Sequence, residues 1–188
     1  MDILAHMLWA GAATALIARR RPVARRTVVA TVGMAAVPDV MQFLPLLGWV
    51  AAGGGPWTLL FDHALATPGN EPALPASMVL LSHHLHCTFH SAVVAALVTA
   101  VVGLVARSFW LPFVGWWSHI VFDVFTHSAE FYAVPVLYPL TYAGLDGIAW
   151  NEPWFMAVNY AALLVAGLWL LRLRRIKPPT ATHRKNPE

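Results

Sequence analysis

Charged side chains are scarce in this chain, at 11% of its 188 residues. A soluble domain carries about 25% charged residues, because its surface must face water. Apolar residues make up 59% of the sequence. A chain with so few charges cannot cover its surface against water, but it can cover it against lipid. The composition therefore excludes an ordinary soluble domain and indicates a membrane protein.

Cysteine is nearly absent too, since Cys87 is the only one, and an intrachain disulfide is excluded. The first residues lack a basic segment and an obvious cleavage site of small residues, so we predict no cleaved signal peptide. At the other end, residues 177–188 are polar and contain three prolines. We predict one membrane-embedded domain over residues 1–176, followed by a disordered cytoplasmic tail over residues 177–188.

Long apolar runs dominate the rest of the sequence. Several approach the roughly 20 residues that an α-helix needs to cross a bilayer, and lipid admits only backbone that is internally hydrogen-bonded. The run at 76–106 is long enough to form one tilted helix. We predict an all-α, polytopic membrane helix bundle with about five transmembrane helices. The five runs are 3–18, 27–52, 76–106, 109–126 and 154–171.

Lysine and arginine gather at 19–26, at Arg107 and at 172–185. Cytoplasmic loops of membrane proteins are enriched in these residues. With five spans, all three basic segments fall on the cytoplasmic side, the N-terminus lies outside and the C-terminus is cytoplasmic. We interpret the clusters as topology anchors and expect no nucleic-acid partner.

Histidine and aspartate recur in four of the apolar runs at a similar depth. At about 1.5 Å per helical residue, they fall in the outer half of the membrane. Ionisable side chains at membrane depth are costly, face the bundle interior and usually mark a functional site. The residues concerned are His6, Asp39, His83, His84, His86, His90, His119, Asp123 and His127.

Spacing places some of these side chains on shared helix faces. His119, Asp123 and His127 are four residues apart, which drifts only about 80° around a helix. Unpaired carboxylates in lipid would need a proton or a cation. Imidazole and carboxylate ligands suit zinc, manganese or iron better than Cu(I), so the cluster predicts a divalent metal site. In contrast, Asp62 and His63 lie in a loop and are expected to be solvated.

Four motifs resemble a bacterial family of small, inner-membrane, metal-dependent hydrolases described as LexA-binding hydrolases. The family pattern is Thr-His, Leu-Pro-Asp-x-Asp, His-Arg-Gly-x-Thr-His-Ser and Ser-His-x-x-x-Asp-x-x-Thr. The corresponding segments here, in the same order, are 5–6 (Ala-His), 37–39 (Val-Pro-Asp), 86–91 (His-Cys-Thr-Phe-His-Ser) and 118–126 (Ser-His-Ile-Val-Phe-Asp-Val-Phe-Thr).

The chain departs from this pattern at several positions. Met41 stands in place of the second aspartate, and Cys87 replaces the arginine, which removes a clamp for a phosphate group. The spacing before His90 is one residue shorter, so either His84 or His86 could be its partner. The family is distantly similar to zinc-dependent phospholipases C and single-strand nucleases, which implies phosphoester hydrolysis by analogy.

Together, the cluster and the resemblance predict an enzyme, a hydrolase that acts on a lipid or lipid-linked ester, most plausibly a phosphoester. It would use one or two divalent metals, zinc first, with manganese or iron as alternatives. Asp39 and His127 are the candidate catalytic residues. We expect the segment 128–153, with its tyrosines, to act either as a lid or as an interfacial connector. The expected metal ligands are His6, Asp39, His86, His90, His119 and Asp123.

The resemblance implies the bacterial inner membrane, and the orientation derived from the basic segments puts the site toward the outer leaflet. Two other functions are also compatible with the sequence. A membrane di-iron oxidase or hydroxylase would use histidines from helix ends, and His86-x-x-x-His90 fits one of the usual boxes. A non-enzymatic protein that binds haem or transports metal is the third, although haem needs no carboxylate ligand.

Overall fold

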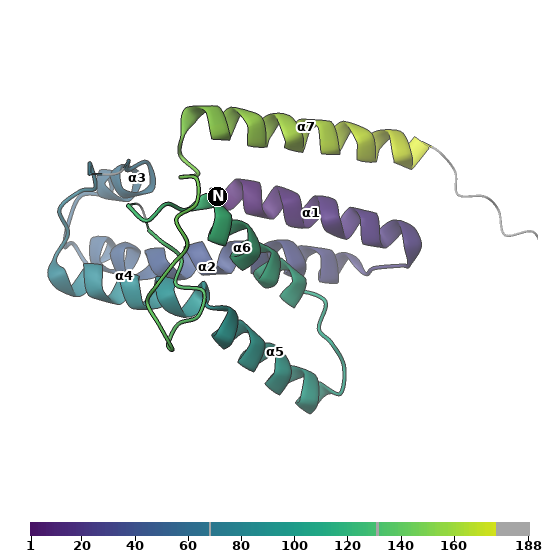
Figure 1. The fold of residues 1–188 in the computed structure, drawn as a ribbon, viewed down its shortest axis with the longest axis horizontal. Helices are drawn as coiled ribbons and strands as arrows, with labels where there is room; N and C mark the ends of the chain where they lie inside the picture. Colours follow the sequence, from purple (N-terminus) through teal and green to yellow (C-terminus); the bar gives the residue numbers. More distant parts are fainter. Residues whose placement is uncertain (68, 131, 176–188) are drawn as a thin grey trace, which may run out of the picture.

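A computed structural model of the chain describes residues 1–67, 69–130 and 132–175. Within these ranges the structure has seven helices and no β-strand, so the predicted all-α class is confirmed (Figure 1). The predicted tail at 177–188 lies outside the described residues. The helices are α1 (Ile3–Arg20), α2 (Arg25–Ala51), α3 (Thr58–Ala64), α4 (Ala76–Phe89), α5 (Ala92–Ala106), α6 (Phe113–Thr126) and α7 (Pro153–Arg175).

Helix α2 is the centre of the bundle. It packs against α1, α4 and α6, and it continues through Pro38 and Pro45 without a break. Helices α1, α2 and α7 lie roughly alongside one another, with α1 and α7 running the same way and α2 the opposite way (Figure 1). At the shared end of α1 and α7, the Arg19 side chain donates a hydrogen bond to the Leu173 carbonyl at 2.5 Å. The basic residues at the end of α1 and those at the end of α7 therefore lie at the same end of the bundle.

The apolar run at 76–106 forms two helices instead of the single tilted helix that its length allows. Helices α4 and α5 meet at His90 and Ser91 with a bend of 58°. The Ser91 hydroxyl accepts a hydrogen bond from the Val94 N–H at 3.1 Å and donates one to the Tyr138 carbonyl at 2.5 Å. Ser91 caps the start of α5 and is held by the segment that contains Tyr138. Helix α4 therefore ends just before Ser91, and His90 lies at the corner between the two helices.

Two helices in the described residues, α2 and α7, are long and apolar enough to cross a membrane. The bent pair α4–α5 would make a third if it forms one span. Helix α6 has only 14 residues, because its first turn begins at Phe113, after Pro112, and not at Phe109. The count of about five spans and the orientation of the termini stay predictions.

Burial in this molecule is inverted relative to a soluble domain. Large apolar side chains lie on the outside, such as Val105 at 82% and Leu164 at 64% exposure. In contrast, His119 and Asp123 are fully buried. Such wide apolar surfaces are rare on soluble monomers, so this distribution fits a chain whose surroundings are apolar.

Helices α2 and α6 approach so closely that their backbones touch. A Cβ atom on Gly115 would lie 2.0 Å from the Thr31 carbonyl oxygen, so only glycine fits there. One turn further along both helices, Nδ1 of His119 lies 2.7 Å from the Ala35 carbonyl oxygen. The following turn of each helix carries Asp39 or Asp123, so this contact brings two carboxylates to the same place.

Candidate metal centre

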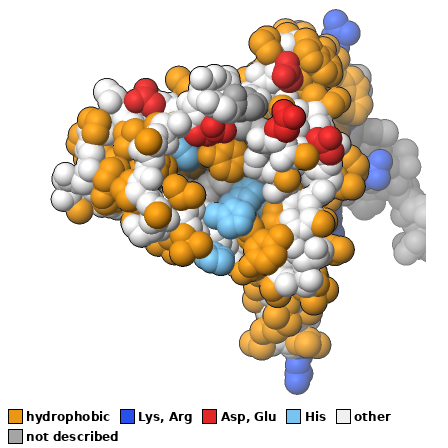
Figure 2. Space-filling model, turned by 60° about the vertical axis from the view of Figure 1, so that its left-hand side comes forward, with side chains coloured by type: hydrophobic (Ala, Val, Ile, Leu, Met, Phe, Trp, Pro, Cys, Tyr) orange, Lys and Arg blue, Asp and Glu red, His pale blue; other side chains and the backbone are white. Residues whose placement is uncertain are grey.

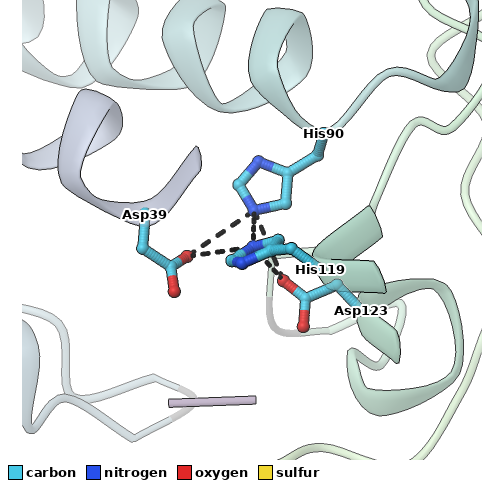
Figure 3. Close-up of side chains that lie close together, drawn as sticks. All are labelled: Asp39, His90, His119 and Asp123. Atoms are coloured by element: carbon cyan, nitrogen blue, oxygen red, sulfur yellow. Dashed lines mark hydrogen bonds and ion pairs between the residues drawn. The ribbon is translucent and has the colours of Figure 1, made fainter. Parts of the chain in front are cut away.

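Four buried side chains from different parts of the fold converge inside the bundle (Figure 3). Asp39 comes from α2, His90 from the corner between α4 and α5, and His119 and Asp123 from α6. Each offers one donor atom, and these four atoms lie within 4.8 Å of one another. Four of the six predicted metal ligands are therefore brought together.

The two imidazole rings face each other through their Nε2 atoms, which are 3.1 Å apart. Oδ2 of Asp123 lies 3.0 Å from Nε2 of His119 and 3.3 Å from Nε2 of His90. Oδ1 of Asp39 lies further away, at 3.6 Å and 3.7 Å from the same two nitrogen atoms. The four donor atoms thus surround one point, and the Asp39 oxygen is the furthest from the two ring nitrogen atoms.

Hydrogen bonds to the backbone determine which nitrogen of each ring carries the proton. Nδ1 of His119 donates to the Ala35 carbonyl at 2.7 Å, and Nδ1 of His90 donates to the His86 carbonyl at 2.9 Å. Because a carbonyl only accepts, both Nδ1 atoms are protonated, and the neutral rings present their Nε2 lone pairs. A hydrogen bond from the far ring nitrogen to a carbonyl, which fixes the orientation of the ring, is typical of metal-ligating histidine.

Such a cluster needs positive charge at its centre. Two lone pairs and two carboxylates that face one another repel unless a cation lies between them. A proton on one ring would satisfy one pair of atoms, whereas a divalent ion would satisfy all four donors. The residues present therefore fit a metal ion.

Asp123 also contacts a second set of groups through its other oxygen. Oδ1 lies 2.8 Å from Nε2 of His6, whose ring stacks on His119 with centroids 3.7 Å apart. Nδ1 of His127 is 3.7 Å from the same oxygen, and the amino group of Met1 is hydrogen-bonded to it. The two oxygens of one carboxylate thus face different imidazoles.

His86 lies beside this cluster but outside the group of four donors. Its ring centroid is 4.2 Å from that of His90, while His84 is exposed, so the structure places His86 next to His90. Nδ1 of His86 donates to Oε1 of Gln42 at 2.8 Å, and the Gln42 amide reaches Oδ1 of Asp39 at 3.4 Å. The buried Nε2 of His86 has no hydrogen-bond partner.

Two cavities adjoin the cluster. One of about 290 Å³ is lined by Asp39 and His127, and a second of about 350 Å³ is lined by His86. On this face the surface is hollowed, and histidine side chains are visible within the hollow (Figure 2). Gln42 and two further residues, His63 and Tyr132, line both cavities.

His63 and Tyr132 were not among the predicted site residues. His63 lies on the short helix α3, and it is half-buried, although we expected a solvated loop residue. Burial lowers the pKa of His63, with Glu71 opposing that effect, and burial raises the pKa of Tyr132. Both side chains are therefore neutral near pH 7, as suits residues that line an apolar entrance.

Tyr132 belongs to the segment 128–153, which the sequence predicted to be a lid or a connector. This segment is tied to the bundle by backbone hydrogen bonds, as from Ala92 N–H to the Val136 carbonyl at 2.8 Å. The Tyr142 ring stacks on His83 with centroids 6.3 Å apart. The segment therefore lies over the corner that carries His90, and its role as a lid stays a prediction.

Comparison with known proteins gave no match to a protein-family model, a curated protein or a solved structure. The function of the site is therefore inferred from its own geometry and chemistry.

Proposed function

We propose that this protein is a membrane-embedded, metal-dependent hydrolase that acts on a lipid or lipid-linked ester, with a phosphoester as the first choice. One observation carries the proposal. The two Nε2 lone pairs of His90 and His119 face each other at 3.1 Å between two buried carboxylates. Asp39, one of those carboxylates, also lines a cavity. A cation site open to a cavity is what metal-assisted hydrolysis requires.

Zinc is the preferred ion, and manganese or iron would accept the same donors. When bound, the metal would activate water and polarise the oxygen of the scissile bond. The contacts of Asp123 support a site for two ions, because Oδ2 faces His90 and His119 while Oδ1 faces His6. Asp123 would then contribute to both sites, and His6 would contribute to the second.

Other side chains of the chain would position the substrate and move protons. His127 lines the cavity beside Asp39, where it can act as the general acid or base at the leaving-group oxygen. Gln42 holds both Asp39 and His86 through its amide, so it fixes the orientation of the carboxylate. Tyr132, in the segment 128–153, would limit the access of water.

A lipid substrate follows from the surroundings of the site. The candidate spans and the exposed apolar side chains indicate an apolar environment, from which an amphiphilic molecule can enter sideways. We place the protein in the inner membrane of a bacterium, with the site in the outer half of the bilayer. The choice of membrane rests on the resemblance to the hydrolase family, and the choice of leaflet rests on the positions of the basic segments.

Elemental analysis of detergent-purified protein tests the metal site. We expect roughly one or two zinc or manganese ions per chain, the number that metallohydrolase sites hold. The variants His119→Ala and Asp123→Ala should lose them, whereas His84→Ala, at an exposed histidine, should retain them. Iron with oxygen-dependent turnover would favour the oxidase instead. Folded protein without stoichiometric metal would overturn the proposal.

Hydrolysis assays then test the reaction. Purified protein would be offered p-nitrophenyl phosphate, bis(p-nitrophenyl) phosphate, phosphatidic acid and a polyprenyl phosphate. His127→Ala should lower kcat by about 10²–10⁴-fold while its metal content is unchanged, as for loss of a general acid or base. His84→Ala is the matched control, since His84 is exposed and lines neither cavity. Equal activity of both variants would remove His127 from the proposed chemistry.

A further inference from the structure

A long, largely apolar groove runs between α1 and α7, away from the metal centre, and Arg174 lines it near the end of α7. Its volume is about 780 Å³, and Val32 of α2 also lines it. Small residues widen it on both sides, with Gly11 and Ala15 on α1 and Gly167 on α7. A Cβ atom on Gly167 would meet no other atom within 4 Å, so this position faces open space.

Helices α1 and α7, which form the two walls of this groove, are joined by hydrogen bonds. Toward the start of α7, the Trp9 indole donates to the Asn159 side chain at 3.0 Å. Toward its end, Arg19 donates to the Leu173 carbonyl at 2.5 Å. A helix about 10 Å across could not enter between α1 and α7 without breaking both bonds. Only an occupant thinner than a helix can therefore enter the groove itself, whereas a helix could lie only over its open face.

The groove meets the cavity of the metal centre at one residue. Leu4, on the first turn of α1, lines both the groove and the cavity of about 290 Å³ that contains Asp39 and His127. From Leu4 to Ala15 the groove follows α1 for about 16 Å, at about 1.5 Å per residue. That length is close to half of the roughly 30 Å hydrocarbon core of a bilayer, the share of one leaflet.

We propose that the groove binds one acyl chain of the lipid substrate, while the polar head of that lipid lies in the cavity beside Asp39. This inference rests on the proposed hydrolase function, to which it adds a subsite. A thin, flexible hydrocarbon chain matches the apolar side chains that line the groove. It can also enter the groove without breaking the hydrogen bonds between α1 and α7. Leu4 then lies where the chain joins the head group.

Photo-crosslinking tests this proposal without any need for turnover. The probe is a long-chain alkyl phosphate with a diazirine at the end of its chain. We expect its label on peptides of α1 and α7, and competition by unlabelled alkyl phosphate but not by the corresponding alcohol. Gly167→Leu should reduce labelling about tenfold, because it overfills the groove. Gly48→Leu is the matched control, since Gly48 is an exposed glycine of α2 that also faces open space and lies outside the groove.

Each outcome identifies which proposal fails. Label confined to helices that do not line the groove, equal labelling of the two leucine variants or equal competition by the alcohol would overturn the acyl-chain subsite. The last result would indicate ordinary surrounding lipid. Hydrolysis of esters with label outside the groove would overturn the subsite alone. Label in the groove without hydrolysis of any ester offered would leave chain binding intact and overturn the hydrolase function.

Discussion

Helix α2 meets α6 very differently from the way α1 meets α7. At the first interface the backbones touch at Gly115 and Thr31, and the charged side chains of the site are buried one and two turns further on. At the second, hydrogen bonds lie on both sides of an apolar groove whose middle is open. The same chain therefore contains one interface that is tightly packed and another that is loosely packed.

The difference in packing follows from the kind of side chain that lies at each interface. Buried carboxylates and imidazoles are tolerated only when their partners are kept at hydrogen-bonding distance, so α2 and α6 must be rigid against each other. An apolar groove does not require rigid packing of its two helices in lipid, because the surrounding acyl chains are as apolar as the leucines that line it. Tight packing is concentrated where the charges are.

The largest expected effect comes from closing the gap that glycine leaves between α2 and α6. Gly115→Ala would place a methyl group 2.0 Å from the Thr31 carbonyl oxygen, and backbone atoms cannot move aside as a side chain can. We expect a loss of about 3 kcal/mol or more in the free energy of unfolding, together with loss of metal. Thermal unfolding in detergent, followed by tryptophan fluorescence, measures it.

Gly167→Ala provides the matched control for this prediction, because its new methyl group meets open space in the groove. It should leave stability unchanged or raise it by up to about 1 kcal/mol, the difference in helix propensity. Equal melting temperatures for the two variants would contradict the contrast between the interfaces.

A smaller effect is expected from Gln42, which supports the site without belonging to the four donors. Gln42→Ala removes the hydrogen bonds to His86 and Asp39. Removing hydrogen bonds that orient a metal ligand weakens metal binding by about 10–100-fold. Competition with a chelator measures the affinity, and Asn70→Ala, at an exposed amide in the loop after α3, is the control. Unchanged affinity in Gln42→Ala would show that Asp39 is oriented by other contacts.

The smallest effect is expected at the contact between α1 and α7. Tyr160→Phe removes the hydrogen bond from its hydroxyl to Oδ1 of Asp2, which is 2.9 Å long. Interhelical hydrogen bonds in membrane proteins contribute about 0.6 kcal/mol on average. We expect a decrease in unfolding free energy of that size relative to the unsubstituted protein. A decrease above about 2 kcal/mol would mean that α7 is held far more firmly than its exposure indicates.

Local features of the sequence predicted much of the fold. The apolar runs at 3–18, 27–52 and 154–171 correspond to α1, α2 and α7, because length and apolarity are readable in a linear sequence. The spacing of His119 and Asp123 placed both on one helix face, and the structure brings both into the cluster. Helical periodicity sufficed for these predictions.

Features set by distant contacts were not predictable. The break at Ser91 depends on the carbonyl of Tyr138, which is 47 residues away in the sequence. Helical spacing set His84 off the face of His86 and His90, but the shortened motif left both histidines open as the partner of His90, and the structure buries His86 and leaves His84 exposed. Gln42 could have been suspected, since it stands one helical turn after Asp39, but nothing local indicated that His63 reaches the same cavities. Tertiary structure decided each of these positions.

The corner at His90 and Ser91 has a consequence for biosynthesis. The donors of the candidate site come from α2, from this corner and from α6, so a ribosome must synthesise the chain past Asp123 before all four exist. Until then Asp39 has no imidazole partner from α6. A complete set of four donors therefore exists only after most of α6 has been synthesised, and α7, which forms one side of the groove, is synthesised after all of them.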